Sequence, residues 1–236
     1  MGQAHVLQHV AFEGPGTIGP WLARSGYRVR TTRLDRGDGL PDCADVDLLV
    51  IMGGPMSVHD TARFPWLTDE IRLVGQCVRQ AIPTLGVCLG AQIMAAATGA
   101  RVFPNAEREI GWHPIRGVRS APGVDTFDFP AETTVFHWHG ETFDLPPGAI
   151  HLAESEACRH QAFQLGRSAI GLQFHLETTP DLVDGLVEHA GADLVPSRYV
   201  QSATDLLRHD SAPYARIAPL LDAVLSFLVR SRPVTR

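Results

Sequence analysis

The stretch at residues 81–92, AIPTLGVCLGAQ, contains the strongest indication of how this chain folds. Its first half is an apolar run typical of a buried strand, and the alanine-rich run that follows at 93–97 is typical of a helix. Glycines at 86 and 90 permit a sharp turn between the two, which would push the side chain of Cys88 into solvent. The stretch therefore predicts a strand–turn–helix unit with an accessible cysteine at the turn.

Cys88 has the setting of a nucleophile. A thiol at a helix N-terminus is favoured as the thiolate by the helix dipole. The next backbone N–H, that of Leu89, would point to the place where a tetrahedral oxyanion forms. The stretch thus predicts acyl transfer through a thioester. The competing interpretation is a buried cysteine on a tight turn, because free cysteines are often core residues.

A candidate base for Cys88 lies in the run LQFHLE at 172–177, which predicts a strand leading into a loop. Side chains two positions apart on a strand face the same side, so His175 and Glu177 would point together. A histidine oriented by a carboxylate is what a cysteine nucleophile requires. Taken singly, the two residues are explained by a surface or hydrogen-bonded histidine and a solvated acid at a strand end, but these explanations do not account for both residues together with the Cys88 turn.

The rest of the chain predicts an α/β fold. Strand-like runs alternate with helix-like runs in the first hundred residues, which indicates right-handed crossovers and a parallel sheet; the expected strands are 6–10, 27–31 and 46–52, and the expected helices 18–23 and 66–80. After residue 99 the pattern changes to β-like runs divided by Gly/Pro turns, which predicts an antiparallel excursion over 101–103, 112–118, 134–138, 149–153 and 161–165, before the chain returns at 169–174.

The C-terminal part is expected to be helical. Thr179 and Pro180 have the types preferred at a helix cap and first position. The amphipathic stretch 203–230 is expected to be broken at Pro213 and Pro219. We therefore expect one domain over 1–236, with a core at about 5–190 and a helical extension at about 191–236.

Composition excludes several classes of function. The chain has 236 residues, a net charge of −6 and no lysine among its 20 basic residues, which argues against nucleic-acid binding. No run approaches the roughly 20 apolar residues of a membrane helix, and no signal peptide is evident. Four scattered cysteines without C-x-x-C spacing argue against a zinc site or disulfide framework. We expect a cytoplasmic protein without a cofactor.

Several motifs in this order resemble one known family, the class I (triad-type) glutamine amidotransferases, and in particular stand-alone proteins similar to the glutaminase domain of GMP synthase. The motifs lie within about 46–180 and are MGGPMSV at 52–58, GVCLGAQ at 86–92, EIGW at 109–112, HWHGETF at 137–143, QAF at 161–163 and QFHLE at 173–177. Two residues depart from the family pattern. Leu176 replaces the usual proline, and His160 replaces the asparagine usual in the stand-alone subgroup.

The resemblance implies a flavodoxin-like open sheet, mostly parallel, with helices on both faces. It also implies that Cys88 attacks the side-chain amide of glutamine, with His175 as base and Glu177 as its orienting carboxylate. The backbone N–H groups of Gly54 and Leu89 would bind the oxyanion. Substrate contacts are expected from Gly53, Gln92, His137, Trp138, His139, Gly140 and Phe163. A metal site at His137, His139 and Glu141 has suitable residue types, but the resemblance gives this segment to glutamine.

Three functions stay open. The first is hydrolysis of the glutamine amide with delivery of ammonia; since no ATP-binding P-loop or synthetase domain is evident, an acceptor would be bound by a separate protein. The second is hydrolysis of a γ-glutamyl peptide or amide, for which His160 leaves room. The third is a catalytically silent subunit that holds glutamine, against which the intact set Cys88, His175 and Glu177 argues.

Overall fold

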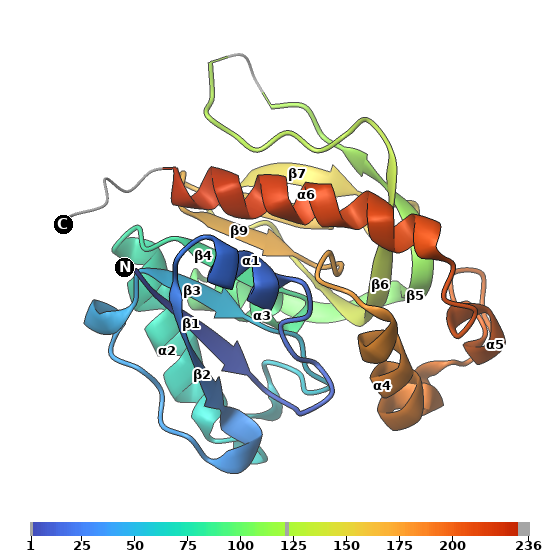
Figure 1. Ribbon diagram of the computed structural model, residues 1–236, viewed down its shortest axis with the longest axis horizontal. Coiled ribbons are helices and arrows are strands. Elements are labelled where there is room, and N and C mark those ends of the chain that lie inside the picture. Colours follow the sequence, from blue (N-terminus) through green and yellow to red (C-terminus); the bar gives the residue numbers. More distant parts are fainter. Residues whose placement is uncertain (1, 121–122, 231–236) are drawn as a thin grey trace.

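The computed structural model describes residues 2–120 and 123–230. Within this part of the chain one nine-stranded sheet has the order β2-β1-β3-β4-β9-β8-β7-β5-β6 (Figure 1). Five neighbouring strands are parallel: β2 (Arg28–Arg33), β1 (Gln3–Gln8), β3 (Leu48–Ile51), β4 (Thr84–Val87) and β9 (Ala169–Leu172). The other four are antiparallel: β8 (Ala162–Leu165), β7 (Ile150–Glu154), β5 (Val102–Gly117) and β6 (Thr133–Phe143). The predicted α/β fold with an antiparallel excursion is confirmed.

Helices cover both faces of the parallel strands. Helices α1 (Ile18–Arg24) and α6 (Ser211–Val229) pack on one face, in an apolar cluster with Val6, Val50 and Leu85 (Figure 1). Helices α2 (Trp66–Arg79) and α3 (Leu89–Ala97) pack on the other, with Leu7, Leu49 and Ile51. Nearly every position of β1 and β3 is buried, and successive side chains join opposite clusters because they point to opposite faces of the strand.

The antiparallel part contains one strand where the sequence pattern predicts two. The runs expected at 101–103 and 112–118 belong to the single long strand β5, which pairs with β6 and carries a register shift between Pro104 and Glu109. The intervening residues are mostly polar and include Pro104, and a bulge accommodates such a segment without ending the strand. Pattern alone therefore divided one irregular strand into two.

The C-terminal part contains one correction. Helix α4 (Pro180–Ala190) begins as expected, with the Thr179 side chain accepting a hydrogen bond from the Leu182 N–H. The short helix α5 (Ala203–Leu206) follows, and α6 then runs unbroken through both prolines. Pro213 lies in the first turn, where an N–H has no helical partner to lose, and exposed Pro219 lies inside the helix. The remaining short elements are 3-10 helices: η1 (Leu34–Arg36), η2 (Cys43–Asp45), η3 (Asp60–Ala62) and η4 (Gly191–Asp193).

Helix α6 is part of the core layer described above. By length and composition it could also span a membrane. However, Ile217, Leu221, Val224, Leu225, Phe227 and Leu228 are buried in the same apolar cluster as β1 and β3, as in a core helix. The expected boundary between a core and an extension near residue 190 stays a prediction.

Candidate active site

The turn between β4 and α3 has the strained geometry expected around Cys88. This residue has φ 51° and ψ −107°, a backbone conformation that residues other than glycine rarely adopt. Two glycines allow it. A Cβ atom on Gly90 would lie 2.1 Å from the carbonyl oxygen of Ile51, and one on Gly86 would lie 2.6 Å from the backbone of Gly90. The expected strand–turn–helix unit is therefore present, and only glycine fits at both positions.

The Cys88 side chain is buried but faces a cavity. Its residue is 7% exposed, so the thiol is less open to solvent than the sequence pattern suggested. The sulfur lies 3.6 Å from the carbonyl oxygen of Trp138, and the amide of Gln173 donates to it over 3.6 Å. The Cys88 N–H donates to the Leu172 carbonyl over 2.7 Å, which holds the turn against β9.

His175 and Glu177 meet beside the thiol. His175 Nδ1 lies 2.7 Å from Glu177 Oε1, and the two side chains are only 5% and 4% exposed. The expected strand through this segment is wrong, because β9 ends at Leu172 and only an isolated bridge joins His175 to Phe136 of β6. The His175 N–H donates to the Phe136 carbonyl over 2.8 Å. The antiparallel part of the sheet thus holds this histidine in place.

The charge balance around His175 favours its protonated form. Burial alone would lower the pKa of His175, but the Glu177 carboxylate and the Cys88 side chain together raise that pKa well above its ordinary value. His175 Nε2 has no hydrogen-bond partner of regular geometry among the described residues. Cys88 is therefore the neighbour that can exchange a proton with this nitrogen.

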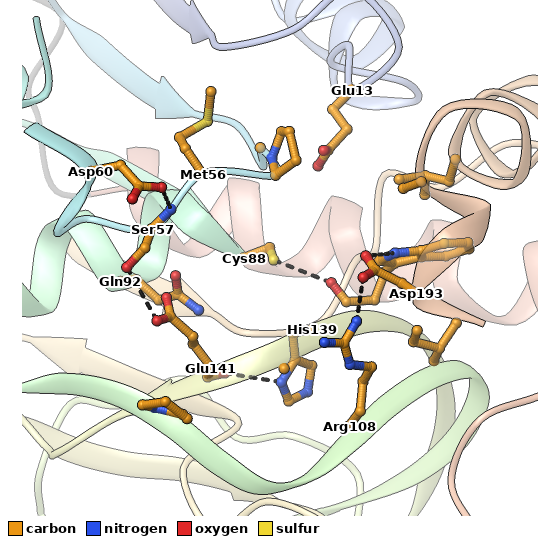
Figure 2. A pocket seen from close by; sticks show the side chains of 18 residues that line it. Glu13, Met56, Ser57, Asp60, Cys88, Gln92, Arg108, His139, Glu141 and Asp193 are labelled. Atoms are coloured by element: carbon orange, nitrogen blue, oxygen red, sulfur yellow. Dashed lines mark hydrogen bonds and ion pairs between the residues drawn. The ribbon is translucent and has the colours of Figure 1, made fainter. Parts of the chain in front are cut away.

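A cavity of about 390 Å³ opens over Cys88, and Figure 2 shows the side chains that line it. Six of the predicted residues line it: Cys88, Gly54, Gln92, Trp138, His139 and Gly140. The rim also carries four acidic residues and one arginine, namely Glu13, Asp60, Glu141, Asp193 and Arg108. Arg108 is paired with Asp193, and Glu141 accepts a hydrogen bond from Ser57 over 3.1 Å.

The other predicted residues lie outside the cavity lining. His175 and Glu177 are buried beside it, and a Cβ atom on Gly53 would lie 3.3 Å from His175 Cε1. Phe163 is fully buried and packs edge-on against Phe143 at a centroid distance of 5.1 Å. His137 is also fully buried. His160, where the sequence departs from the stand-alone subgroup, does not line the cavity, and its Nδ1 lies 2.7 Å from the Phe143 carbonyl oxygen.

Two backbone donors lie beside the thiol. Gly54 lines the cavity, and a Cβ atom there would come within 2.9 Å of the Leu89 side chain, so Gly54 and Leu89 are neighbours. Leu89 is the first residue of α3, where N–H groups have no helical acceptor. Among the hydrogen bonds of the described chain, neither the Gly54 nor the Leu89 N–H has a protein acceptor. Both groups can therefore bind an oxygen of a ligand.

Glu109, His137 and His139 form a buried group behind the cavity wall. Glu109 Oε2 lies 3.3 Å from His139 Nε2 and 3.6 Å from His137 Nδ1, so the mutual distances could accommodate a metal ion. However, Ser155 and Gln161 also donate to this oxygen, over 3.0 and 2.6 Å, and would compete with an ion for it. Glu141, considered with these histidines from sequence, does not belong to the group.

The electrostatics of this buried group are those of a buried carboxylate stabilised by hydrogen-bond donors. Burial alone would raise the pKa of Glu109, but hydrogen bonds from His139 and Ser155 lower it to about 2. Burial lowers the pKa of His137 to about 3, so its ring is uncharged at neutral pH. The group fixes the β6 segment that supplies Trp138 and His139 to the cavity.

Three residues near the site carry no signal in the sequence pattern. The Glu13 carboxyl points into the cavity (Figure 2), and burial raises its pKa to about 7, against the opposing influence of His175. His9 and Glu70 form a fully buried pair under the Gly53–Gly54 loop. Each is a single polar residue outside any recognised motif, and only the three-dimensional arrangement brings them to the site.

Comparison with known proteins agrees with this geometry. Residues 22–187 match the family model "Glutamine amidotransferase class-I". The glutamine amidotransferase-like protein YfeJ of Salmonella typhimurium is 35% identical over 215 residues, which cover 86% of this chain and 89% of that protein. The GMP synthase of Thermomicrobium roseum is 34% identical over 130 residues, which cover 55% of this chain but only 23% of that enzyme.

Solved structures extend the likeness to the whole chain. A glutamine amidotransferase from Thermotoga maritima superposes with a TM-score of 0.86 at 28% identity, over 98% of this chain and 99% of that one. One from Methylobacillus flagellatus superposes with a TM-score of 0.88 at 32% identity, over 98% and 95%. The chain therefore belongs to the class I glutamine amidotransferase family, whose enzymes hydrolyse the glutamine amide with a cysteine nucleophile.

Proposed function

We propose that this protein hydrolyses the side-chain amide of glutamine through a thioester on Cys88 and releases glutamate and ammonia. The observation that carries the proposal is the convergence at one cavity of the Cys88 thiol, the His175–Glu177 pair 2.7 Å apart, and two backbone donors. No one of these groups implies the reaction alone. Together they supply a nucleophile, a base and an oxyanion site.

The reaction begins with transfer of the Cys88 proton to His175 Nε2. The sulfur then attacks the amide carbon, and the Gly54 and Leu89 N–H groups stabilise the oxyanion, each by about 100- to 1,000-fold in rate. The protonated His175 gives its proton to the departing nitrogen, which leaves as ammonia. His175 next takes a proton from water, whose oxygen attacks the thioester, and the proton returns to the sulfur as glutamate leaves. Glu177 holds Nδ1 throughout.

Substrate binding is assigned to the cavity wall. Gln92, Trp138, His139 and Gly140 line the cavity and are proposed to contact glutamine directly. Gly53, His137 and Phe163 lie behind them and are proposed to act by holding the wall in shape. Gln92 donates to Gln173 over 3.2 Å, and Gln173 in turn reaches the Cys88 sulfur, so one amide chain joins the wall to the nucleophile.

The ammonia acceptor is proposed to be bound by a separate protein. Relatives named GMP synthase, of which this chain matches about a quarter to a third, support a synthetase as that partner. A thiol nucleophile works only while reduced, which supports a cytoplasmic location. Neither a nucleic acid nor a membrane is proposed as a partner.

Turnover assays test the proposal. Glutamine, glutathione and γ-glutamyl amides are compared with wild-type protein, a Cys88→Ala variant and a Cys158→Ala control, whose buried thiol lies outside the cavity lining. We expect glutamine turnover that is lost in Cys88→Ala and kept in the control. Activity on γ-glutamyl peptides alone would indicate the alternative hydrolase, and glutamine binding without turnover would indicate a silent subunit.

A further inference from the structure

A second histidine–carboxylate pair lies under the cavity and has no part in the proposed chemistry. His9 follows β1, and its Nε2 lies 2.9 Å from Oε1 of Glu70 on α2. Both side chains are 0% exposed. Burying charged groups is costly unless they are closely paired, so a pair of this kind needs an explanation beyond surface solvation.

The other ring nitrogen of His9 contacts the loop that carries Gly54. His9 Nδ1 lies 2.9 Å from the carbonyl oxygen of Gly53. A carbonyl and a carboxylate both accept hydrogen bonds, so a ring that serves both must donate from both nitrogens, as the protonated form does. Burial alone would lower the pKa of His9, but Glu70 and the Gly53 carbonyl outweigh burial and raise it.

The contact with the Gly53 carbonyl determines where the Gly54 N–H points. The Gly53–Gly54 peptide is trans, as are all described peptide bonds. In a planar trans peptide the C=O and the following N–H point in opposite directions. When His9 holds the carbonyl on its side, the Gly54 N–H must face away from His9. Gly54 lines the cavity, and its N–H has no protein acceptor among the described hydrogen bonds.

We infer that His9 and Glu70 are a positioning pair that holds the Gly53–Gly54 peptide with the Gly54 N–H aimed at the developing oxyanion. The inference rests on the proposed function, because it assigns Gly54 as an oxyanion donor. Glu70 anchors the ring from α2, and Trp66 of the same helix stacks on it at a centroid distance of 5.6 Å. The glycine pair Gly53-Gly54 has no side chains to fix the loop, so an external hydrogen bond sets the peptide plane.

Kinetic measurements on His9→Phe, Glu70→Gln and His9→Asn test the inference. Phenylalanine fills the ring volume and removes both donors. We expect kcat for glutamine to fall by about 100- to 1,000-fold, the effect of losing one oxyanion donor, while KM changes less than about threefold. Glu70→Gln keeps the shape and is expected to lower kcat less. His9→Asn can place an amide N–H near the position of Nδ1 and is expected to recover part of the rate.

A second measurement distinguishes loss of the Gly54 N–H orientation from a general disruption of the active site. Iodoacetamide alkylates a thiol by direct displacement, a step that builds no oxyanion at an amide carbon. The rate of alkylation at Cys88, followed by mass spectrometry, is therefore expected to stay within about threefold of wild type in all three variants. His209→Phe is the matched control, because His209 makes a similar 2.9 Å contact with Asp184 at the surface. This control is expected to retain wild-type kcat.

Each outcome decides the inference. If His9→Phe keeps kcat near wild type, or if turnover and alkylation fall in parallel, the positioning role is wrong although the proposed function stands. If His9→Phe does not fold, the Glu70→Gln variant decides by the same two rates. Wild-type protein that alkylates at Cys88 but turns over no glutamine would overturn the proposed function and the inference with it.

Discussion

Cys88 is held in a left-handed conformation that costs about 1–3 kcal/mol for a residue with a side chain. Three hydrogen bonds and two glycines make it possible. Its N–H is bonded to Leu172, its carbonyl accepts from Ala91 and Gln92 at the start of α3, and two flanking glycines remove steric conflict. The strain places the sulfur at the cavity and leaves the Leu89 N–H free. The turn thus lowers the stability of the fold slightly and in return presents the nucleophile to the cavity.

The Glu177→Gln variant tests the role of the carboxylate beside His175. Glutamine has almost the same shape, but its amide does not stabilise the charged imidazole that the buried Glu177 favours. We expect kcat for glutamine to fall by roughly 100- to 10,000-fold with little change in KM. Glu188→Gln, on the exposed side of α4, is the matched control and should behave as wild type. A tenfold or smaller loss in Glu177→Gln would contradict the triad.

Glu13 predicts a specific feature of the pH profile. Its carboxyl has a pKa of about 7 and interacts with His175. It is therefore mostly protonated below pH 7 and carries a negative charge above it, where that charge stabilises protonated His175. We expect kcat/KM to rise through an inflection near pH 7, and Glu13→Gln to lack this inflection while keeping the activity of the low-pH form. An unchanged profile in the variant would show that Glu13 does not influence the reaction.

The site was only partly predictable from sequence, for a physical reason. Cys88, His175 and Glu177 were found because each belongs to a short local pattern whose spacing places a side chain. His9 and Glu70 are 61 positions apart and meet only because α2 packs beside the end of β1. Phe163 and His137 were expected to touch substrate, but both are fully buried and neither lines the cavity. Local patterns do not contain these orientations.

At the scale of elements, the approach of α3 to β3 is set by Gly90, whose Cβ would meet the Ile51 carbonyl at 2.1 Å. Gly90→Ala would push the N-terminus of α3 off the sheet. We expect a loss of about 1–3 kcal/mol in the free energy of unfolding, measured by urea titration, and a fall in kcat because Leu89 moves. Gly191→Ala is the control, since no atom lies within 4 Å of its Cβ position and its φ is −59°. Equal effects of the two changes would contradict this packing argument.

Elements whose hydrophobic residues recur with a clear strand or helix periodicity were predictable, and elements shaped by tertiary contacts were not. The parallel strands and α2 lie close to their expected positions, because burial on both faces or on one helical face leaves a clear hydrophobic pattern. The polar middle of β5 concealed a continuous strand, whose pairing with β6 outweighs its residue preferences. In α6, packing on the sheet maintains a helix that Pro219 would disfavour in isolation.

Helix α6 therefore predicts a stabilising substitution. Pro219 is exposed and leaves the carbonyl of Ala215 without its helical donor. Pro219→Ala restores that hydrogen bond, and we expect the free energy of unfolding to rise by about 1–3 kcal/mol in urea titration. Pro213→Ala in the first turn is the matched control and should change it by less than about 0.5 kcal/mol, because no helical bond is gained there. A stability gain from Pro213→Ala as large as that from Pro219→Ala would argue against this explanation.

At the scale of the whole molecule, the site lies between segments that follow the parallel strands and the β5–β6 pair of the antiparallel half. Cys88 and Gly54 follow parallel strands, whereas Trp138 and His139 belong to antiparallel β6. His175 follows the last parallel strand but is held by Phe136 of β6. The nucleophile and its substrate wall thus come from different halves.

The buried group at Glu109 joins strands of the antiparallel half and predicts how the whole fold responds to acid. His137 has a pKa of about 3 in the folded chain against an ordinary value of 6.5. The unfolded chain therefore binds the extra proton between these values, and stability is lost as pH falls from 6.5 toward 3, by at most about 1.4 kcal/mol per pH unit for this group. His9 and His175, whose pKa values are raised, act in the opposite sense: their stabilisation is present below the ordinary value of 6.5 and is lost as pH rises above it. Comparing His137→Phe with wild type isolates the first effect: urea titrations between pH 4.5 and 6.5 should give a flatter dependence in the variant, and an unchanged slope in the half-exposed control His189→Gln. A slope in His137→Phe equal to that of wild type would mean that acid acts on the fold elsewhere.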